Sequence, residues 1–325
     1  MPRLNELRLM SRVAQMYHLD GLTQAEIARH MRISQATVSR MLKKAVQEEI
    51  VRTTVVAPSG IFTELESTLR DQFALTEAIV VECSEDSYGP ILSRIGEAAA
   101  HHLETTLQDG EVIGVSSWSE TILKMVDNIH PMKSSRAKYV VQTLGGMGDP
   151  TVQIHANQLT TRLAKLTGAE AHLLNAPGVA QSQEAKLVML GDTYVHETMA
   201  LFRKITLAFG GIGAMEPSSL LSRSGNVFSE RELAEIFRAG GVGNIGLRFF
   251  DAEGRSVKTP LDDRVIGMTL DEMKTVERVI ALAGGASKTA AIRGALKTGA
   301  IDVLITDKFT AARLAGMTET VKAGH

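Results

Sequence analysis

Cysteine is nearly absent from this sequence of 325 residues, which contains only Cys83. One cysteine excludes an intramolecular disulfide framework and any metal site built from several cysteines, as is typical of a reducing compartment. Long apolar runs are also missing: no stretch of about 18 uninterrupted apolar residues occurs, and residues 1–10 lack the apolar segment of a signal peptide. We therefore expect a cytoplasmic protein.

A large excess of charge of one sign is lacking too, since the formal net charge is −2. The charge is unevenly distributed: residues 1–56 carry nine Lys or Arg against five Asp or Glu, and the remainder carries 26 against 32. A basic head on an acidic body indicates nucleic acid at one end only. Residues 58–60, Pro-Ser-Gly, mark the change, so we expect two domains, residues 1–57 and 58–325.

The head shows the pattern of a helix-turn-helix. Apolar residues recur near helical spacing over residues 4–18, 24–31 and 35–49, which predicts three helices, and residues 51–57 could form a strand or small wing. Thr23 with Glu26 three residues later predicts a capping box, and Ser34 is expected to cap the third helix. Short polar side chains at the front of that helix suit base edges, and cations farther along suit phosphates.

The alternative for the head is an ordinary amphipathic helix pair with a solvated basic face. We favour DNA binding, and we expect a homodimer or homotetramer because one head contacts too few base pairs to select a site. The residues expected to contact DNA are Thr23, Gln24, Ser34, Gln35, Ala36, Thr37, Ser39, Arg40, Lys43 and Lys44.

The body alternates short apolar runs with amphipathic stretches, which predicts a doubly wound, mostly parallel α/β sheet with helices on both faces. The expected strands are residues 78–81, 112–115, 139–144, 205–209, 276–283 and 303–305. Several of them lead directly into glycine or small polar residues. Ligands of open α/β sheets bind at such carboxyl ends, so we expect a ligand site there.

Three segments together resemble the SorC family of sugar-responsive bacterial regulators: DGLTQAEIARHMRISQATVSRMLKKA (residues 20–45), VGNIGLRFFDAEG (242–254) and GGASKTAAIRGALKTGAIDVLITD (284–307). The resemblance implies a large domain with the fold of ribose-phosphate isomerases and glucosamine-phosphate deaminases. It also implies a regulator of a carbohydrate or polyol operon, whose DNA affinity or assembly changes when a phosphosugar or related polyol binds.

Physical arguments suggest which residues would hold that effector. Lys288 lies in the first turn of a helix that follows Gly284 and Gly285, with Ser287 as its expected cap. A cation there opposes the helix dipole unless an anion lies nearby, so a phosphate is expected, although a solvent-exposed lysine is the alternative. In the loop at residues 116–121, hydroxyls could bind a phosphate, and the family usually has glycine where Ser119 stands.

Other candidates have plain structural alternatives. The sole tryptophan could cover a sugar or act as a packing anchor, and Asp251 could accept ligand hydroxyls or form a turn. The full set of expected effector contacts is Ser117, Trp118, Ser119, Thr121, Gly145, Gly146, Gln153, Asn157, Gly211, Arg248, Asp251, Gly284, Gly285 and Lys288.

The rival function is a sugar-phosphate isomerase or deaminase with a fused DNA-binding head. That chemistry needs a positioned acid or base, and the candidates Glu120, Asp251, Asp262 and Asp263 form no compact constellation in the sequence. Some relatives hold an aldehyde sugar through a Schiff-base lysine, but residues 140–146 contain no lysine. We therefore expect noncovalent binding, no enzymatic activity, no cofactor and no metal, and we disfavour an architectural DNA binder without a ligand.

Overall fold

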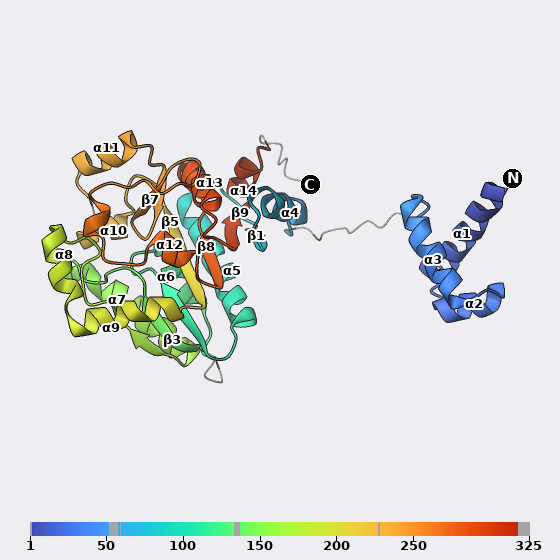
Figure 1. The fold of residues 1–325 in the computed structure, drawn as a ribbon, viewed down its shortest axis with the longest axis horizontal. Helices are drawn as coiled ribbons and strands as arrows, with labels where there is room; N and C mark the ends of the chain where they lie inside the picture. The colour runs from blue at the N-terminus through green and yellow to red at the C-terminus, as the bar shows by residue number, and fades with distance from the viewer. Residues whose placement is uncertain (1, 52–57, 59, 133–136, 227, 318–325) are drawn as a thin grey trace. The chain divides into compact units, whose positions relative to one another are not determined.

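The computed structural model describes residues 2–51, 58, 60–132, 137–226 and 228–317. The chain divides into two compact units, Met1–Pro58 and Ser59–His325, close to the boundary expected from charge and composition (Figure 1). Within the described residues, no helix is both long and apolar enough to cross a membrane.

The first unit contains three helices, α1 (Pro2–His18), α2 (Gln24–Met31) and α3 (Gln35–Gln47). The three predicted helices are thus present, although the third ends two residues early. Val13, Ile27 and Val38 are fully buried at the centre of their shared core. Residues 52–57, where a strand or wing was expected, lie outside the described residues.

The second unit is built on a sheet of nine strands in the described part of the chain, which confirms the predicted fold class. The strands are β1 (Glu77–Val81), β2 (Glu111–Val115), β3 (Ala137–Gln142), β4 (Glu170–His172), β5 (Leu207–Gly213), β6 (Gly243–Ile245), β7 (Arg248–Phe250), β8 (Arg278–Leu282) and β9 (Val303–Asp307). The main path runs β1-β9-β8-β5-β2-β3-β4, and every pair along it is parallel.

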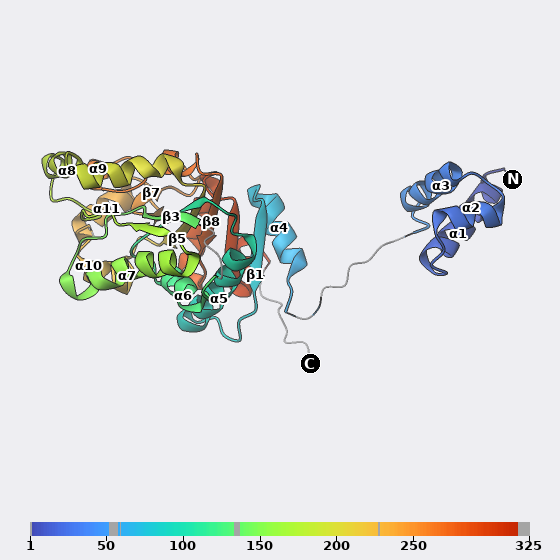
Figure 2. The ribbon, with the colours of Figure 1, turned by 90° about the horizontal axis from the view of Figure 1, so that it is seen from below.

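Both faces of this sheet are covered. Strand β8 shows why: Val279 and Ala281 join one apolar cluster, whereas Ile280 and Leu282 join the other. The helices are α4 (Thr63–Phe73), α5 (Tyr88–Thr106), α6 (Glu120–Asn128), α7 (Pro150–Thr167), α8 (Gln183–Leu190), α9 (Thr193–Ala200), α10 (Ser219–Ser224), α11 (Glu230–Arg238), α12 (Leu270–Met273), α13 (Thr289–Lys297) and α14 (Lys308–Leu314). Figure 2 shows α5, α6 and α7 together on one side.

The order of the strands creates a crevice between β2 and β5. From β2 the chain proceeds outward to β3 and β4, then returns to β5 on the other side of β2 and proceeds through β8 to β9. Connections therefore leave these two neighbouring strands in opposite directions. A ligand of an open α/β sheet binds at such a reversal, outside the carboxyl ends of the strands.

Residues 242–250, which read as one apolar run, form a hairpin instead. Strand β6 pairs antiparallel with both β5 and β7, and a two-residue turn joins it to β7. The turn residues Gly246 and Leu247 both have positive φ, 57° and 62°, as a tight hairpin turn of the primed type requires. Leu247 is 4 % exposed and packs beside Trp118 in a third apolar cluster, which keeps a leucine in this unfavourable conformation.

Candidate functional site

The start of α2 and the start of α3 are both capped as predicted. Thr23 Oγ1 accepts a hydrogen bond from the backbone N–H of Glu26 (3.3 Å), and the Glu26 carboxylate accepts one from Thr23 N (2.8 Å). The Thr23 hydroxyl also donates to the Glu26 carboxylate at 2.7 Å, and this bond together with the one from Thr23 N holds the pKa of Glu26 below its ordinary value. Ser34 Oγ accepts from Thr37 N at 3.1 Å. The two caps fix where the turn between the helices begins and ends.

The front of α3 presents a polar surface. Gln35, Ala36, Arg40 and Lys43 are exposed, as are the caps, while Gln24, Thr37, Ser39 and Lys44 are half-buried. Arg40 reaches back to Thr37 Oγ1 at 3.4 Å, and Lys44 pairs with Glu6 at 2.6 Å. The residues expected to contact DNA thus lie at the starts of α2 and α3 and along α3. One of the two expected phosphate contacts, Lys44, forms an ion pair within the same unit.

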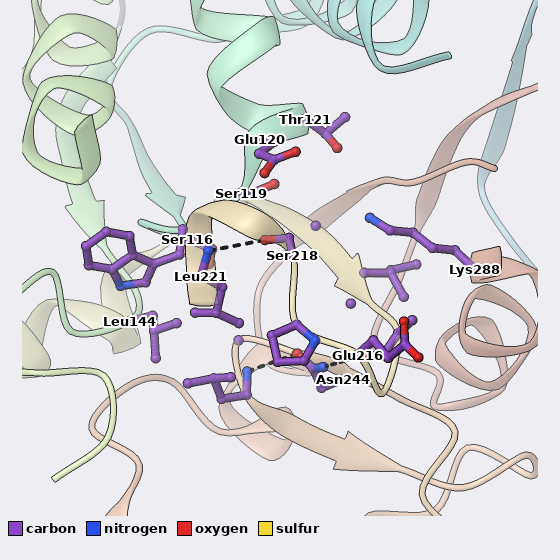
Figure 3. Close-up of a pocket in the computed structure, with 18 of the residues that line it drawn as sticks. Ser116, Ser119, Glu120, Thr121, Leu144, Glu216, Ser218, Leu221, Asn244 and Lys288 are labelled. Atoms are coloured by element: carbon purple, nitrogen blue, oxygen red, sulfur yellow. Dashed lines mark hydrogen bonds between the residues drawn. The ribbon is translucent and has the colours of Figure 1, made fainter. Parts of the chain in front are cut away.

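A pocket lies at the crevice between β2 and β5, with a cavity volume of about 70 Å³ for the centres of water-sized molecules. Its walls come from segments far apart in the sequence: the loop after β2 with the start of α6, the end of β5 with its following loop, the β6–β7 hairpin, and Lys288 (Figure 3). Tyr88, Leu144 and Leu221 complete the lining. Polar lining residues include Ser116, Ser119 and Asn244. A cavity lined by both polar and apolar residues therefore lies where a ligand site was expected.

Glu120 joins three of these segments. It is the first residue of α6, and its carboxylate accepts hydrogen bonds from Tyr88 Oη (2.7 Å) and from the backbone N–H of Leu220 in α10 (3.1 Å). Burial and the bond to Glu120 raise the pKa of Tyr88 above its ordinary value. Glu120 therefore carries a negative charge in the pocket wall while holding neighbouring segments together.

Lys288 extends toward the side of the pocket that carries Glu120 (Figure 3). Its ammonium lies 5.8 Å from the centre of the Tyr88 ring, and it forms no ion pair within 4.0 Å among the described residues. Burial lowers the pKa of Lys288, and the negative charge of Glu120 opposes that effect. The predicted anion contact is thus a half-buried cation facing the cavity rather than a solvated lysine.

Five of the expected effector contacts line this pocket: Trp118, Ser119, Thr121, Gly211 and Lys288. Gly211 lies close to Ser119, because a Cβ at position 211 would lie 2.5 Å from Ser119 Oγ and would displace that hydroxyl. Trp118 is 4 % exposed, and its Nε1 donates to the carbonyl of Gly145 at 2.8 Å. It therefore serves as a packing anchor as well as part of the pocket wall.

The structure places five others around the loop that follows β3. Ser117 Oγ donates to the Leu144 carbonyl (2.8 Å), Gln153 Oε1 accepts from Gly148 N (3.3 Å), and Asn157 Oδ1 accepts from Gln142 Nε2 (3.4 Å). Gly145 and Gly146 belong to the loop, where their backbone N–H groups donate to the carbonyls of Ile266 and Leu174. These five residues hold the loop after β3 in place and do not line the pocket.

Arg248 and Asp251 also have partners elsewhere. The buried Arg248 guanidinium donates to the carbonyls of Asp262, Val265, Gly267 and Met268 at 3.1–3.4 Å. Asp251 accepts from the backbone of the turn that it begins and pairs with Arg255 at 2.8 Å, so the turn alternative describes its geometry. Neither side chain lines the pocket.

The segment before α13 differs in detail from the prediction. The Gly285 N–H is already used by Asp307 Oδ2 (3.1 Å) and Thr310 Oγ1 (2.8 Å). Ser287 does not cap the helix, because a short 3₁₀ turn (Ala286–Lys288) precedes α13 and Lys288 occupies the cap position without a side-chain cap bond. Gly284 and Gly285 therefore position Lys288 rather than offering a free Gly285 N–H to a ligand.

Sequence reasoning missed Tyr88, Ser218 and Asn244 in the pocket. Asn244 donates to the carbonyl of Ala214 (3.2 Å) and accepts from Leu247 N (3.4 Å), which ties the loop after β5 to the hairpin. Asn244 reaches the cavity only because of the hairpin turn, and a Gly-Leu pair is not a sequence that predicts such a turn. Glu120 lies in the loop at residues 116–121 that was expected to bind the effector, but its carboxylate was considered only as a possible catalytic acid or base.

Comparisons with known proteins agree with both units. Residues 60–315 match the family model Sugar-bind, a sugar-binding domain, and residues 13–59 match a MarR family model. The deoxyribonucleoside regulator of Bacillus subtilis (strain 168) is 30% identical over 307 residues, covering 94% of this chain and 97% of that protein. The erythritol catabolism regulatory protein EryD of Brucella abortus (strain 2308) is 30% identical over 312 residues, covering 95% and 96%.

Among solved structures, the full-length sorbitol operon regulator SorC from Klebsiella pneumoniae matches with a TM-score of 0.71 and 26% identity, covering 96% of this chain and 99% of that one. These relatives are regulators rather than enzymes, so the isomerase or deaminase alternative is not favoured. The chain belongs to the SorC family of sugar-responsive transcriptional regulators and combines an N-terminal helix-turn-helix with a C-terminal sugar-binding domain.

Proposed function

We propose that this regulator acts in the cytoplasm as a homodimer or homotetramer, binds operator DNA through α3, and is controlled by a sugar, phosphosugar or polyol. The effector binds noncovalently in the pocket between β2 and β5. The observation that carries the proposal is the cavity at the reversal of strand order, which is lined by Glu120 and Lys288 within a sugar-binding domain.

Control requires that the effector bind the DNA-competent and DNA-incompetent arrangements with different affinity. A tenfold change in operator affinity corresponds to about 1.4 kcal/mol of coupling between the two sites. The loop after β5 lines the pocket, and the start of α10 is joined to Glu120 through Leu220 N, so a shift of these segments on binding is a route by which occupancy changes how subunits assemble.

Replacing exposed residues of α3 should separate sequence recognition from general DNA affinity. We expect Gln35→Ala to reduce the preference for the operator over random DNA by about tenfold, since one well-read base pair contributes about 1–3 kcal/mol. Lys43→Ala should instead weaken binding to both DNAs and reduce the salt dependence by about one released ion. Fluorescence anisotropy on a duplex selected by the wild-type protein from a random library measures both.

Lys204→Ala is the matched control, because Lys204 is an exposed lysine of the other unit. If Gln35→Ala and Lys43→Ala both retained wild-type affinity, preference and salt dependence, α3 would not be the DNA-contacting helix.

The effector site is tested by thermal unfolding against a panel of free and phosphorylated sugars and polyols. A compound at 100 times its dissociation constant should stabilise the protein by about 2.7 kcal/mol. We expect Lys288→Ala to lose most of that stabilisation, whereas Lys204→Ala should retain it. Equal stabilisation of Lys288→Ala and wild type would show that the compound binds elsewhere.

A further inference from the structure

The first turn of α6 carries its own negative charge into the pocket. A helix N-terminus is ordinarily a favourable place for a ligand phosphate, because its backbone N–H groups lack partners. Here Ser119 Oγ accepts from Ile122 N at 3.3 Å, and Glu120 occupies the first helical position. A carboxylate in the first turn interacts favourably with the helix dipole, as a phosphate would. The protein thereby supplies from its own chain the anion that a phosphorylated ligand would bring.

The charges of the residues that line the cavity also disfavour a phosphorylated ligand. The lining residues include two carboxylates, Glu120 and Glu216, and one cation, Lys288. Burial lowers the pKa of Lys288, and the negative charge of Glu120 opposes that shift. A phosphate at Lys288 would add about two negative charges on the side that faces Glu120, and like charges at short range repel strongly where water is partly excluded.

Glu120 still has capacity to bind neutral groups. A carboxylate offers about four acceptor positions, and the structure uses two, for Tyr88 Oη and Leu220 N. The remaining positions suit hydroxyl donors. Lys288, across the cavity, is a donor and suits hydroxyl oxygens. Both groups can therefore be satisfied by one polyhydroxylated molecule without any ionic group.

We infer that the effector is an unphosphorylated, uncharged polyhydroxylated compound, with hydroxyls that donate to Glu120 and accept from Lys288. Glu120 is the specificity-determining residue that excludes phosphorylated analogues. This inference rests on the proposed effector function of the pocket and narrows the class of compound that it takes.

Isothermal titration of the full-length protein with matched pairs tests the inference. The pairs are erythritol and erythritol 4-phosphate, ribose and ribose 5-phosphate, and sorbitol and sorbitol 6-phosphate, with inorganic phosphate as a separate probe. For any pair that binds, we expect the uncharged member to bind at least about tenfold more tightly, and Glu120→Gln to reduce or reverse that ratio by about tenfold.

Glutamine removes the charge and keeps one oxygen for Leu220 N, while its amide NH2 replaces the oxygen that accepts from Tyr88 Oη. Glu230→Gln is the matched control, since Glu230 is an exposed first residue of α11, follows a serine cap, and lies outside the pocket. It should retain the wild-type ratio. Unfolding curves of both variants establish that they are folded at the titration temperature.

The outcomes distinguish failure of the inference about an uncharged effector from failure of the proposed function. Tighter binding of the phosphorylated member by the wild type overturns the inference and leaves the proposed function standing. A preference for the uncharged member that Glu120→Gln leaves unchanged overturns the role of Glu120. If no member of any pair binds or alters DNA affinity, the proposed function fails together with the inference.

Discussion

Arg248→Met should lower the free energy of unfolding of the second unit by about 3 kcal/mol. The guanidinium of Arg248 is buried and donates to four backbone carbonyls between residues 262 and 268. Methionine fills similar space but donates nothing, so these carbonyls lose their partner in a site with little access to water. Breaking a buried charged network by removing one side costs about 3–5 kcal/mol, and each buried group left unpaired about 1–3 kcal/mol.

The segment that Arg248 holds also reaches the loop after β3, because Met268 N donates to the Thr143 carbonyl at 2.7 Å. Urea denaturation followed by circular dichroism measures the loss of stability. Arg238→Met is the control, since Arg238 is exposed at the end of α11 and should change stability little. A fully stable Arg248→Met protein with lost effector binding would instead support the ligand role first expected for this arginine.

Asp307→Ala should be similarly destabilising and should also weaken effector binding. The Asp307 carboxylate is fully buried and accepts from Gly285 N (3.1 Å), Phe309 N (3.0 Å), Thr310 N (2.9 Å) and Thr310 Oγ1 (2.6 Å). Alanine removes the cap of α14 and leaves several buried donors without an acceptor, at a combined cost of about 3 kcal/mol. Because Gly285 lies three residues before Lys288, the pocket cation loses its fixed support.

Denaturation and titration with an effector from the thermal panel measure the two effects. Asp271→Ala is the matched control, because the Asp271 side chain is 90% exposed and should be nearly neutral. Effector binding by the folded Asp307→Ala protein with wild-type affinity would contradict the link between this carboxylate and Lys288.

Much of the fold could be predicted from apolar runs in the sequence and from helix-capping residues. The expected strands at residues 112–115, 276–283 and 303–305 overlap β2, β8 and β9. Parallel strands that are buried on both faces consist of continuous apolar runs, which can be recognised in the sequence. The caps Thr23 and Ser34 were predictable because capping depends on local chemistry alone. Glycine and small polar residues directly after the expected strands predicted a ligand site at the carboxyl ends of strands, whereas the strand order came only from the structure.

The remaining errors arise where tertiary contacts decide. Strand β4 has three residues and is held only at the edge of the sheet by pairing with β3, so it has no pattern of its own. Arg248 was expected at a ligand because its sequence neighbours do not reveal that carbonyls from residues 262–268 surround it. Ser287 is a suitable cap residue that the preceding turn of backbone leaves unused. The contacts to DNA and effector stay predictions.

The hairpin turn at Gly246 and Leu247 gives position 247 two opposing demands. Glycine or asparagine would ease the left-handed backbone there, yet either would remove the leucine side chain that lines the pocket and packs beside Trp118. A substitution at position 247 that favours the left-handed backbone would therefore remove part of the cavity wall. A substitution with a bulkier side chain would strain the turn. The backbone of this one hairpin turn and the wall of the pocket therefore place opposite requirements on the residue at position 247.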